Sequence, residues 1–292
     1  MFQRLWSALK GAFASSVLVA NAVTICLGLI PLALVKLAVP RQGALRRSLD
    51  HSLNAMADRW VAVNGWWMAR VGRTRWDVAG LEGLRRKGWY LVSSNHQSWV
   101  DILVLQKVLH SRVPFLKFFL KHQLLYVPVM GLAWWALDFP FMKRRSGSRS
   151  ADLATARRAC EKFRQIPTAV MNFLEGTRFS RAKHDAQQSP YRHLLKPKVG
   201  GLATALSAMG ERFDALLDVT IVYPDGVPSF WDLLSGKVKR VVVRVRERAI
   251  PKDLLAGDYE GDPVFRARMQ AFVQDMWAEK DRQIEEIILG LG

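Results

Sequence analysis

The chain has 292 residues, half of them hydrophobic, so it can bury a sizeable core and is neither a disordered nor a collagen-like protein. Its 43 Lys and Arg residues against 25 Asp and Glu residues give a net charge of +18. This excess favours a polyanionic partner, which is a nucleic acid, an anionic membrane surface or a phosphorylated substrate. The two cysteines, Cys26 and Cys160, lie far apart, which excludes a disulfide framework and a cysteine metal site and favours a reducing compartment.

The first predicted element is an apolar helix over 11–35. Between Lys10 and Lys36 the sequence has no charged residue, and about 20 helical residues span the roughly 30 Å apolar core of a bilayer. More basic residues follow this segment than precede it, which predicts that its C-terminal side is cytoplasmic. A helix that anchors the chain in a membrane is therefore expected.

Two alternatives to a single spanning helix remain open. Residues 20–22 read Ala-Asn-Ala, which resembles the cleavage site of a secretory signal. Pro31 could instead bend the helix back into a hairpin with the apolar stretch Trp60–Ala69, which is too short to span a bilayer alone. We expect residues 1–70 to form the membrane anchor, as a helix over 11–35 alone or in a hairpin with residues 60–69, and residues 71–292 to form the second domain.

Beyond residue 70, short apolar runs alternate with helical patterns, which is typical of βαβ units and a largely parallel sheet. The predicted strands are Trp89–Ser94, Thr168–Leu174, Leu217–Tyr223 and Val238–Val245, the last with the alternation of a half-exposed edge strand. The predicted helical or apolar segments are Val100–Leu109, Val127–Leu137, Ser150–Arg164, Leu202–Met209 and the amphipathic Pro263–Leu289, which covers the sheet or lies on the membrane. The fold class is therefore α/β, with a mostly parallel sheet flanked by helices.

A histidine follows the first of these strands directly. His96 lies at the carboxyl end of a strand, where open α/β sheets place their sites, and Asp101 follows it in the first turns of the next helix. A carboxylate on one ring nitrogen fixes the imidazole tautomer and leaves the other nitrogen free to take a proton from a hydroxyl. Ser98 to Asp101 also matches a helix capping box, in which Asp101 only caps the helix. From these residues alone, the two interpretations are equally supported.

A second polar stretch follows the strand Thr168–Leu174. In this turn Gly176 lets the backbone approach a ligand closely, Thr177 supplies a hydroxyl, and Arg178 can bind two phosphate oxygens. The turn therefore suits a phosphate group, although an ordinary turn with solvated charges has the same composition.

Together the two stretches resemble the motifs of the glycerolipid acyltransferases, membrane enzymes that acylate glycerol 3-phosphate and lysophospholipids. Those motifs are Asn-His followed, after four further residues, by Asp, and Phe-x-Glu-Gly-Thr-Arg. Here they correspond to Asn95, His96 and Asp101, and to Phe173–Arg178. Two further stretches are similar to lysocardiolipin-type acyltransferases and their bacterial inner-membrane relatives, and these are Phe139–Arg144 and Val219–Pro224.

The resemblance implies roles for individual residues. His96 deprotonates a glycerol hydroxyl, which attacks a thioester carbonyl, and Asp101 orients the imidazole. The residues implied to bind the acceptor are Lys143, Arg144, Glu175, Gly176, Thr177 and Arg178, with Glu175 supporting the turn. Aromatic residues over Trp60–Trp67 and Phe115–Phe119 suit an acyl-chain tunnel, a membrane interface or ordinary core packing.

The resemblance also implies the partners of the chain. They are membrane lipids, with a lysophospholipid as acceptor, and an acyl-CoA or acyl-carrier-protein thioester as donor, with no bound cofactor, no metal and no nucleic acid. The expected location is the inner membrane, with the catalytic domain on its cytoplasmic face. A lipase with Ser94 or Ser98 as its nucleophile is disfavoured, because the sequence contains no Gly-x-Ser-x-Gly elbow. A non-catalytic basic module tethered to anionic lipid or nucleic acid remains the alternative, and it leaves His96 and Asp101 unexplained.

Overall fold

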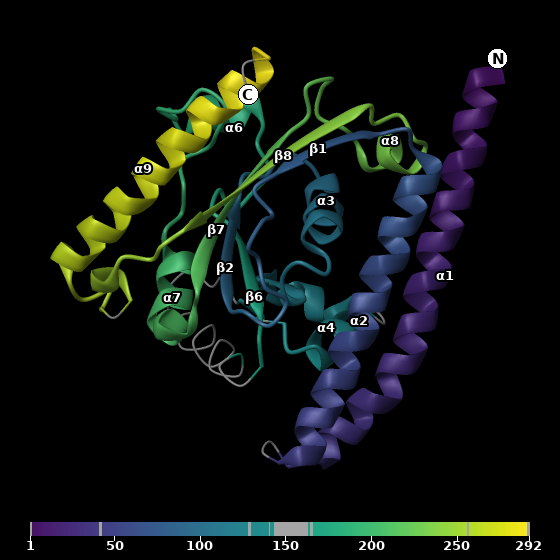
Figure 1. The fold of residues 1–292 in the computed structure, drawn as a ribbon, viewed down its shortest axis with the longest axis horizontal. Helices are drawn as coiled ribbons and strands as arrows, with labels where there is room; N and C mark the ends of the chain where they lie inside the picture. Colours follow the sequence, from purple (N-terminus) through teal and green to yellow (C-terminus); the bar gives the residue numbers. More distant parts are fainter. Residues whose placement is uncertain are drawn as a thin grey trace.

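A central sheet separates two layers of helices (Figure 1). The computed structural model describes residues 2–40, 43–127, 130–139, 141–142, 163, 166–255 and 257–290. The predicted helix Ser150–Arg164 lies outside the described residues, except for Phe163.

Six strands form the sheet in the order β1-β8-β7-β2-β6-β3. The strands are β1 (Arg75–Ala79), β2 (Tyr90–Ser94), β3 (Leu116–Phe118), β6 (Ala169–Phe173), β7 (Ala215–Val222) and β8 (Arg240–Arg248). All neighbours are parallel except β7 and β8, which run antiparallel. The predicted fold class, a mostly parallel sheet flanked by helices, is confirmed.

The edge position predicted for the strand Val238–Val245 is wrong. The alternation of valine with basic residues in β8 suggested a half-exposed edge, but β8 lies between β1 and β7, and β1, which was not predicted, is the edge. Three of the four basic side chains of β8 pair with acidic residues on neighbouring strands, and the fourth, Arg246, pairs with Glu279 of the C-terminal helix. Arg240 and Arg244 both bond Asp77 of β1, and Arg248 bonds Asp218 of β7.

Alternate residues of the strands pack into two separate hydrophobic cores, one on each face of the sheet. Tyr90 and Val92 of β2 pack with α1, α2 and α3, whereas Leu91 between them packs with α7 and α9 on the other face. Helix α9 (Pro263–Ile288) covers that second face. Asp262 caps its first turn, and Pro263 at the first helical position needs no hydrogen-bond partner. The sequence left open whether this helix covers the sheet or lies on the membrane, and in the structure it covers the sheet.

The N-terminal segment is a hairpin of two long helices, α1 (Phe2–Ala38) and α2 (Ala44–Val71), which run side by side along one flank (Figure 1). Pro31 lies inside continuous α1, and the chain reverses between Ala38 and Ala44. A buried amide pair joins the helices, because Asn21 donates to Asn64 Oδ1 and to the carbonyl of Trp60. By length and composition, Arg4–Ala38 could cross a membrane, and only 17% of its most apolar 18-residue window is buried.

The remaining elements are short. The helices are α3 (Val100–Leu109), α4 (Met130–Ala136), α6 (Arg181–Ala186), α7 (Gly200–Met209) and α8 (Phe230–Leu234), with 3₁₀ turns at His122–Tyr126, Gly210–Arg212 and Lys252–Leu254. Strands β4 (Leu120–Lys121) and β5 (Phe141–Met142) pair in parallel. Helix α4 lies within the predicted apolar run Val127–Leu137, and it packs against α1.

Candidate active site

Strand β2 ends and helix α3 begins at the site. The side chain of Asn95, which is fully buried, continues the sheet past the end of β2: its Nδ2 donates to the carbonyl of Ile221 and its Oδ1 accepts from the amide of the same residue, both at 2.8 Å. His96 follows at once, and its ring stacks on Phe173 at the end of β6 with 3.9 Å between ring centroids. Two neighbouring strands therefore hold the imidazole.

Asp101 contacts His96 from the first turn of α3. Its Oδ2 lies 2.9 Å from Nδ1 of His96 and also accepts hydrogen bonds from the backbone amides of Gln97 (2.6 Å) and Ser98 (2.8 Å). The side chain is 1% exposed. The two interpretations from the sequence, a helix cap and a partner of the imidazole, therefore hold together. The same carboxylate accepts hydrogen bonds from amides at the start of the helix and binds the imidazole.

The second oxygen of Asp101 accepts a hydrogen bond from Tyr223. The hydroxyl of Tyr223 lies 2.6 Å from Oδ1 and comes from the end of β7. Burial, and then the nearby charge of Asp101, raise the pKa of Tyr223 well above its ordinary value, so the hydroxyl keeps its proton and donates. With both oxygens engaged, the Asp101 carboxylate has little freedom to rotate away from His96.

The other imidazole nitrogen, Nε2, is the one left for a substrate. Within the described ranges no hydrogen bond engages it, and the ring lines a cavity with its side chain 13% exposed. If Nδ1 keeps its proton for Asp101, Nε2 carries a lone pair and can accept one.

Glu175 connects the second motif to His96. Its Oε1 accepts from the backbone amide of His96 at 2.7 Å and its Oε2 from that of Leu195 at 3.1 Å. Burial raises the pKa of Glu175 to about 7, and the two backbone hydrogen bonds oppose this rise. Gly176 takes a φ of 67°, a conformation that glycine adopts without strain. Glu175 thus binds the backbone of two other segments, at His96 and at Leu195, and does not project outward.

The basic side chains of this turn lie close to the imidazole loop. The amide of Phe179 donates to the carbonyl of His96 at 2.7 Å. The guanidinium of Arg178 stacks over Trp99 with 4.8 Å to the ring centroid, and Lys183 donates to the hydroxyl of Thr177 and to the carbonyl of Arg178. Neither Arg178 nor Lys183 pairs with a carboxylate among the residues that the structure describes, so both charges can bind an anion.

Lys143 and Arg144, which the sequence also assigned to the acceptor, lie outside the described residues.

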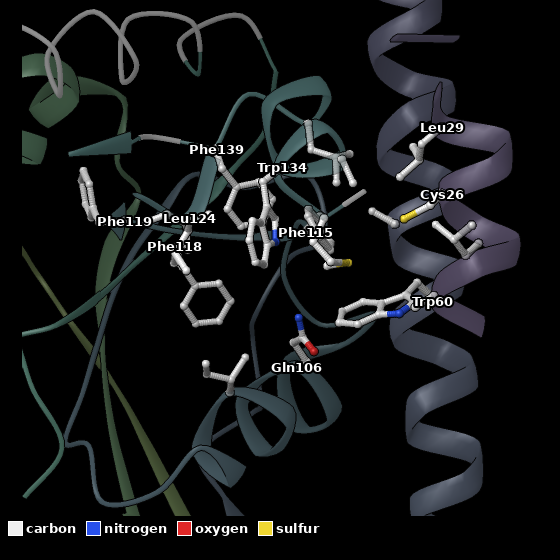
Figure 2. A pocket seen from close by; sticks show the side chains of 18 of the residues that line it. Cys26, Leu29, Trp60, Gln106, Phe115, Phe118, Phe119, Leu124, Trp134 and Phe139 are labelled. Atoms are coloured by element: carbon white, nitrogen blue, oxygen red, sulfur yellow. The ribbon is translucent and has the colours of Figure 1, made fainter. Parts of the chain in front are cut away.

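An apolar cavity of about 410 Å³ opens beside His96 (Figure 2). Its walls come from α1, α2, α3, β3 and α4, and apart from His96 and Gln106 the side chains are aliphatic, aromatic or sulfur-containing. Trp99, which is 57% exposed, lines it where it meets solvent, and Leu29, which is 2% exposed, lines it in the interior. Phe115, Phe118 and Phe119 therefore line a cavity and do more than fill a core.

Sequence reasoning missed two groups of this site. The sequence indicated Tyr223 only as part of a family-like stretch and as the last residue of a predicted strand, and the pairing of that strand with β2 was not predicted. Lys183, six residues after Thr177, gave no signal because its contact depends on the turn into α6. The structure also explains the two serines considered for a lipase. The hydroxyls of Ser94 and Ser98 donate to the backbone carbonyls of Asn95 and Pro228.

Known proteins are similar to this part of the chain in sequence. A family model described as "Acyltransferase" matches residues 75–224, which is half of the chain and includes both motifs. The chain belongs to the acyltransferase family. The membership predicted from the motifs is therefore confirmed. Among the described residues, no group of three or more His, Cys, Asp or Glu side chains could hold a metal ion.

Individual relatives of this acyltransferase are distant. It is 27% identical over 237 residues to 1-acyl-sn-glycerol-3-phosphate acyltransferase 3 of Arabidopsis thaliana, covering 76% of this chain and 59% of that protein. It is 26% identical over 208 residues to lysocardiolipin acyltransferase 1 of Danio rerio, covering 67% and 51%. The chain thus spans between half and three fifths of the length of these two curated relatives.

The fold also has a solved counterpart. The crystal structure of the 1-acyl-sn-glycerophosphate (LPA) acyltransferase PlsC from Thermotoga maritima aligns with a TM-score of 0.56 at 17% identity, covering 96% of this chain and 98% of that one. The likeness extends over almost the whole chain and therefore includes the N-terminal hairpin as well as the sheet.

Proposed function

We propose that this acyltransferase moves a fatty acyl group from a thioester donor to the free hydroxyl of a lysophospholipid. The observation that carries the proposal is the His96–Asp101 pair, whose imidazole lines an apolar cavity next to the Arg178 turn, where the cations have no carboxylate partner among the described residues. A general base, an acyl-chain site and a phosphate site are what this reaction requires at one place.

The reaction follows from the hydrogen bonds of the imidazole. Asp101 holds the proton on Nδ1, so Nε2 of His96 takes the proton of the acceptor hydroxyl as its oxygen attacks the thioester carbonyl. The carbon–sulfur bond then breaks, and the departing sulfur receives the proton from His96. A thiol has a pKa near 8.5 and leaves readily, so the reaction needs neither a covalent acyl-enzyme nor a cofactor.

The acyl chain is assigned to the cavity. Each buried methylene group contributes roughly 0.8 kcal/mol, so a cavity of about 410 Å³ with apolar walls is a strong binding site for a hydrocarbon chain. Trp99 lines the cavity and also stacks under Arg178. The thioester carbonyl and the acceptor phosphate are thereby brought to the same side of His96.

The acceptor phosphate is assigned to the turn that follows β6. Arg178 offers a planar fork of donors and Lys183 a second positive charge. Lys143 and Arg144 are proposed to complete this site, as the motif resemblance implies. The donor is an acyl-CoA or acyl-carrier-protein thioester.

Attachment to the membrane is assigned to the α1–α2 hairpin. Apolar side chains of α1 point away from the protein, among them Phe13, Val23 and Leu27, each at least 48% exposed. A lipid environment would cover this surface. We place the enzyme in the inner membrane with the catalytic domain on the cytoplasmic face, where the basic residues after α1 would lie.

The test is acyl transfer by the full-length protein in anionic lipid vesicles. Labelled acyl-CoA and acyl-carrier-protein donors are offered with a panel of lysophospholipids, and free thiol and labelled phospholipid are measured together. We expect equal amounts of both products, only when a lysophospholipid is present. Free fatty acid without phospholipid would indicate a hydrolase, and no release of thiol would indicate a binding module.

The variant His96→Ala should lower the rate by at least about 10²-fold, since a general base contributes that much. His193→Ala is a matched control, because His193 also pairs with a carboxylate, Glu285, but lies on the opposite side of the sheet against α9. It should transfer at the rate of the unchanged protein. Equal losses in both variants would show that His96 acts only through the fold.

A further inference from the structure

A polar side chain interrupts the apolar cavity. Gln106 of α3 is 7% exposed and lies on the cavity wall. Figure 2 shows it pointing from α3 into the space between Phe118 and Trp60, with the amide nitrogen turned toward the cavity. Within the described part of the chain its side-chain amide makes no hydrogen bond, and its oxygen is buried. A buried amide without partners costs about 1–3 kcal/mol, so its presence here needs a reason.

A second, smaller cavity also adjoins Gln106. It has a volume of about 10 Å³ and is also lined by Asp58 and His110. This volume is about that of one water molecule. His110 Nε2 lies 3.4 Å from Asp58 Oδ1, so a donor and an acceptor share that space. Gln106 therefore adjoins polar groups through this small cavity, whereas its amide nitrogen is turned toward the apolar cavity (Figure 2).

We infer that Gln106 recognises an oxygen substituent, a hydroxyl or a keto group, on the acyl chain that occupies the cavity. This inference rests on the proposed function, which assigns the cavity to the acyl group. The amide N–H donates to that oxygen, so an oxygenated chain satisfies the donor that an unsubstituted chain leaves unpaired. A site built around such a bond discriminates against the substrate that lacks the partner.

The position of Gln106 predicts where the oxygen lies on the chain. Trp99, the residue before α3, and Gln106 within α3 line the same cavity seven residues apart, which is roughly 10 Å along the helix axis. Because the bonds of an extended chain zigzag, each carbon–carbon bond of about 1.5 Å advances the chain by about 1.3 Å, so this distance corresponds to about eight bonds, roughly half of a stearoyl chain. Substituents near the middle of the chain should therefore be recognised, and those next to the thioester should not.

The test compares four thioesters on the donor carrier that is active in the assay above: stearoyl, 3-hydroxystearoyl, 10-hydroxystearoyl and 10-ketostearoyl. We expect kcat/KM for one or both of the 10-substituted donors to exceed that for stearoyl by roughly three- to tenfold, the effect of one buried hydrogen bond. The 3-hydroxy donor should show no such gain. The better of the two 10-substituted donors identifies a hydroxyl or a keto group.

The variant Gln106→Met keeps the length of the side chain and removes the amide. It should abolish the preference while stearoyl transfer persists or rises, because a buried unpaired amide is replaced by an apolar group. The control Ile102→Met, one turn earlier on the same wall, should change all four rates alike. Absence of a preference in the unchanged protein, or its persistence in Gln106→Met, overturns the inference. Absence of transfer from every donor would instead overturn the proposed function.

Discussion

The substitution Asp101→Asn separates helix capping from support of the imidazole. An asparagine oxygen can still accept from the amides of Gln97 and Ser98, as Oδ2 of Asp101 does, and the hydroxyl of Tyr223 can turn to accept from the new amide. The fold should therefore survive with a loss of stability of about 1 kcal/mol or less. What disappears is the negative charge beside the imidazole.

The size of the catalytic effect follows from the geometry. Asp101 Oδ2 lies 2.9 Å from His96 Nδ1, and the carboxylate is almost fully buried. Two charges about 4 Å apart at an effective dielectric constant of about 20 attract by about 4 kcal/mol. This attraction stabilises the imidazolium that forms in the transition state, so its loss corresponds to about a 10³-fold lower kcat.

The assay measures thiol release at saturating donor and acceptor, with thermal unfolding measured on the same preparation. Asp232→Asn is the matched control, because Asp232 also accepts the amide of a serine three residues earlier at the start of a helix, α8, but has no histidine beside it. It should change neither quantity by much. If Asp101→Asn unfolds at a much lower temperature but keeps its kcat, Asp101 is only a helix cap and the reasoning is refuted.

Three further outcomes are expected. Arg178→Lys, which loses the planar fork over Trp99, should raise the acceptor KM about tenfold with little change in the donor KM. If only the donor KM changes, the turn binds a phosphate of the donor and not that of the lysophospholipid. Ala133→Phe, placed on the cavity wall in α4, should lower transfer of long acyl chains about tenfold and spare short ones, whereas equal losses for all lengths would place the chain elsewhere. Burial raises the pKa of Glu175 to about 7, so the folded state holds this proton more tightly than the unfolded chain does. The free energy of unfolding should therefore fall by about 3 kcal/mol as the pH rises from about 4.5 to 7. Denaturant unfolding over this range should show the decline in the unchanged protein and not in Glu175→Gln, and parallel profiles would contradict it.

The contacts that the sequence predicted well are local. His96 and Asp101 are five residues apart, and the chain between a strand end and a helix start has few ways to fold, so their contact could be foreseen. The turn that begins at Glu175 is likewise contained in four residues after a strand. The apolar segment before Lys36 was identified from composition alone, because the length of a bilayer-spanning helix is set by the bilayer.

The tertiary structure alone decided how distant residues complete the site. Tyr223 lies 122 residues from Asp101, and only the adjacency of β7 and β2 brings its hydroxyl to the carboxylate. The cavity takes walls from α1 through α4, so neither its volume nor the exposure of Gln106 to it follows from any single stretch. The place of β8 inside the sheet likewise depended on pairing with β1 and β7, because an alternating pattern of apolar and charged residues is the same for solvent-facing charges and for charges paired across strands.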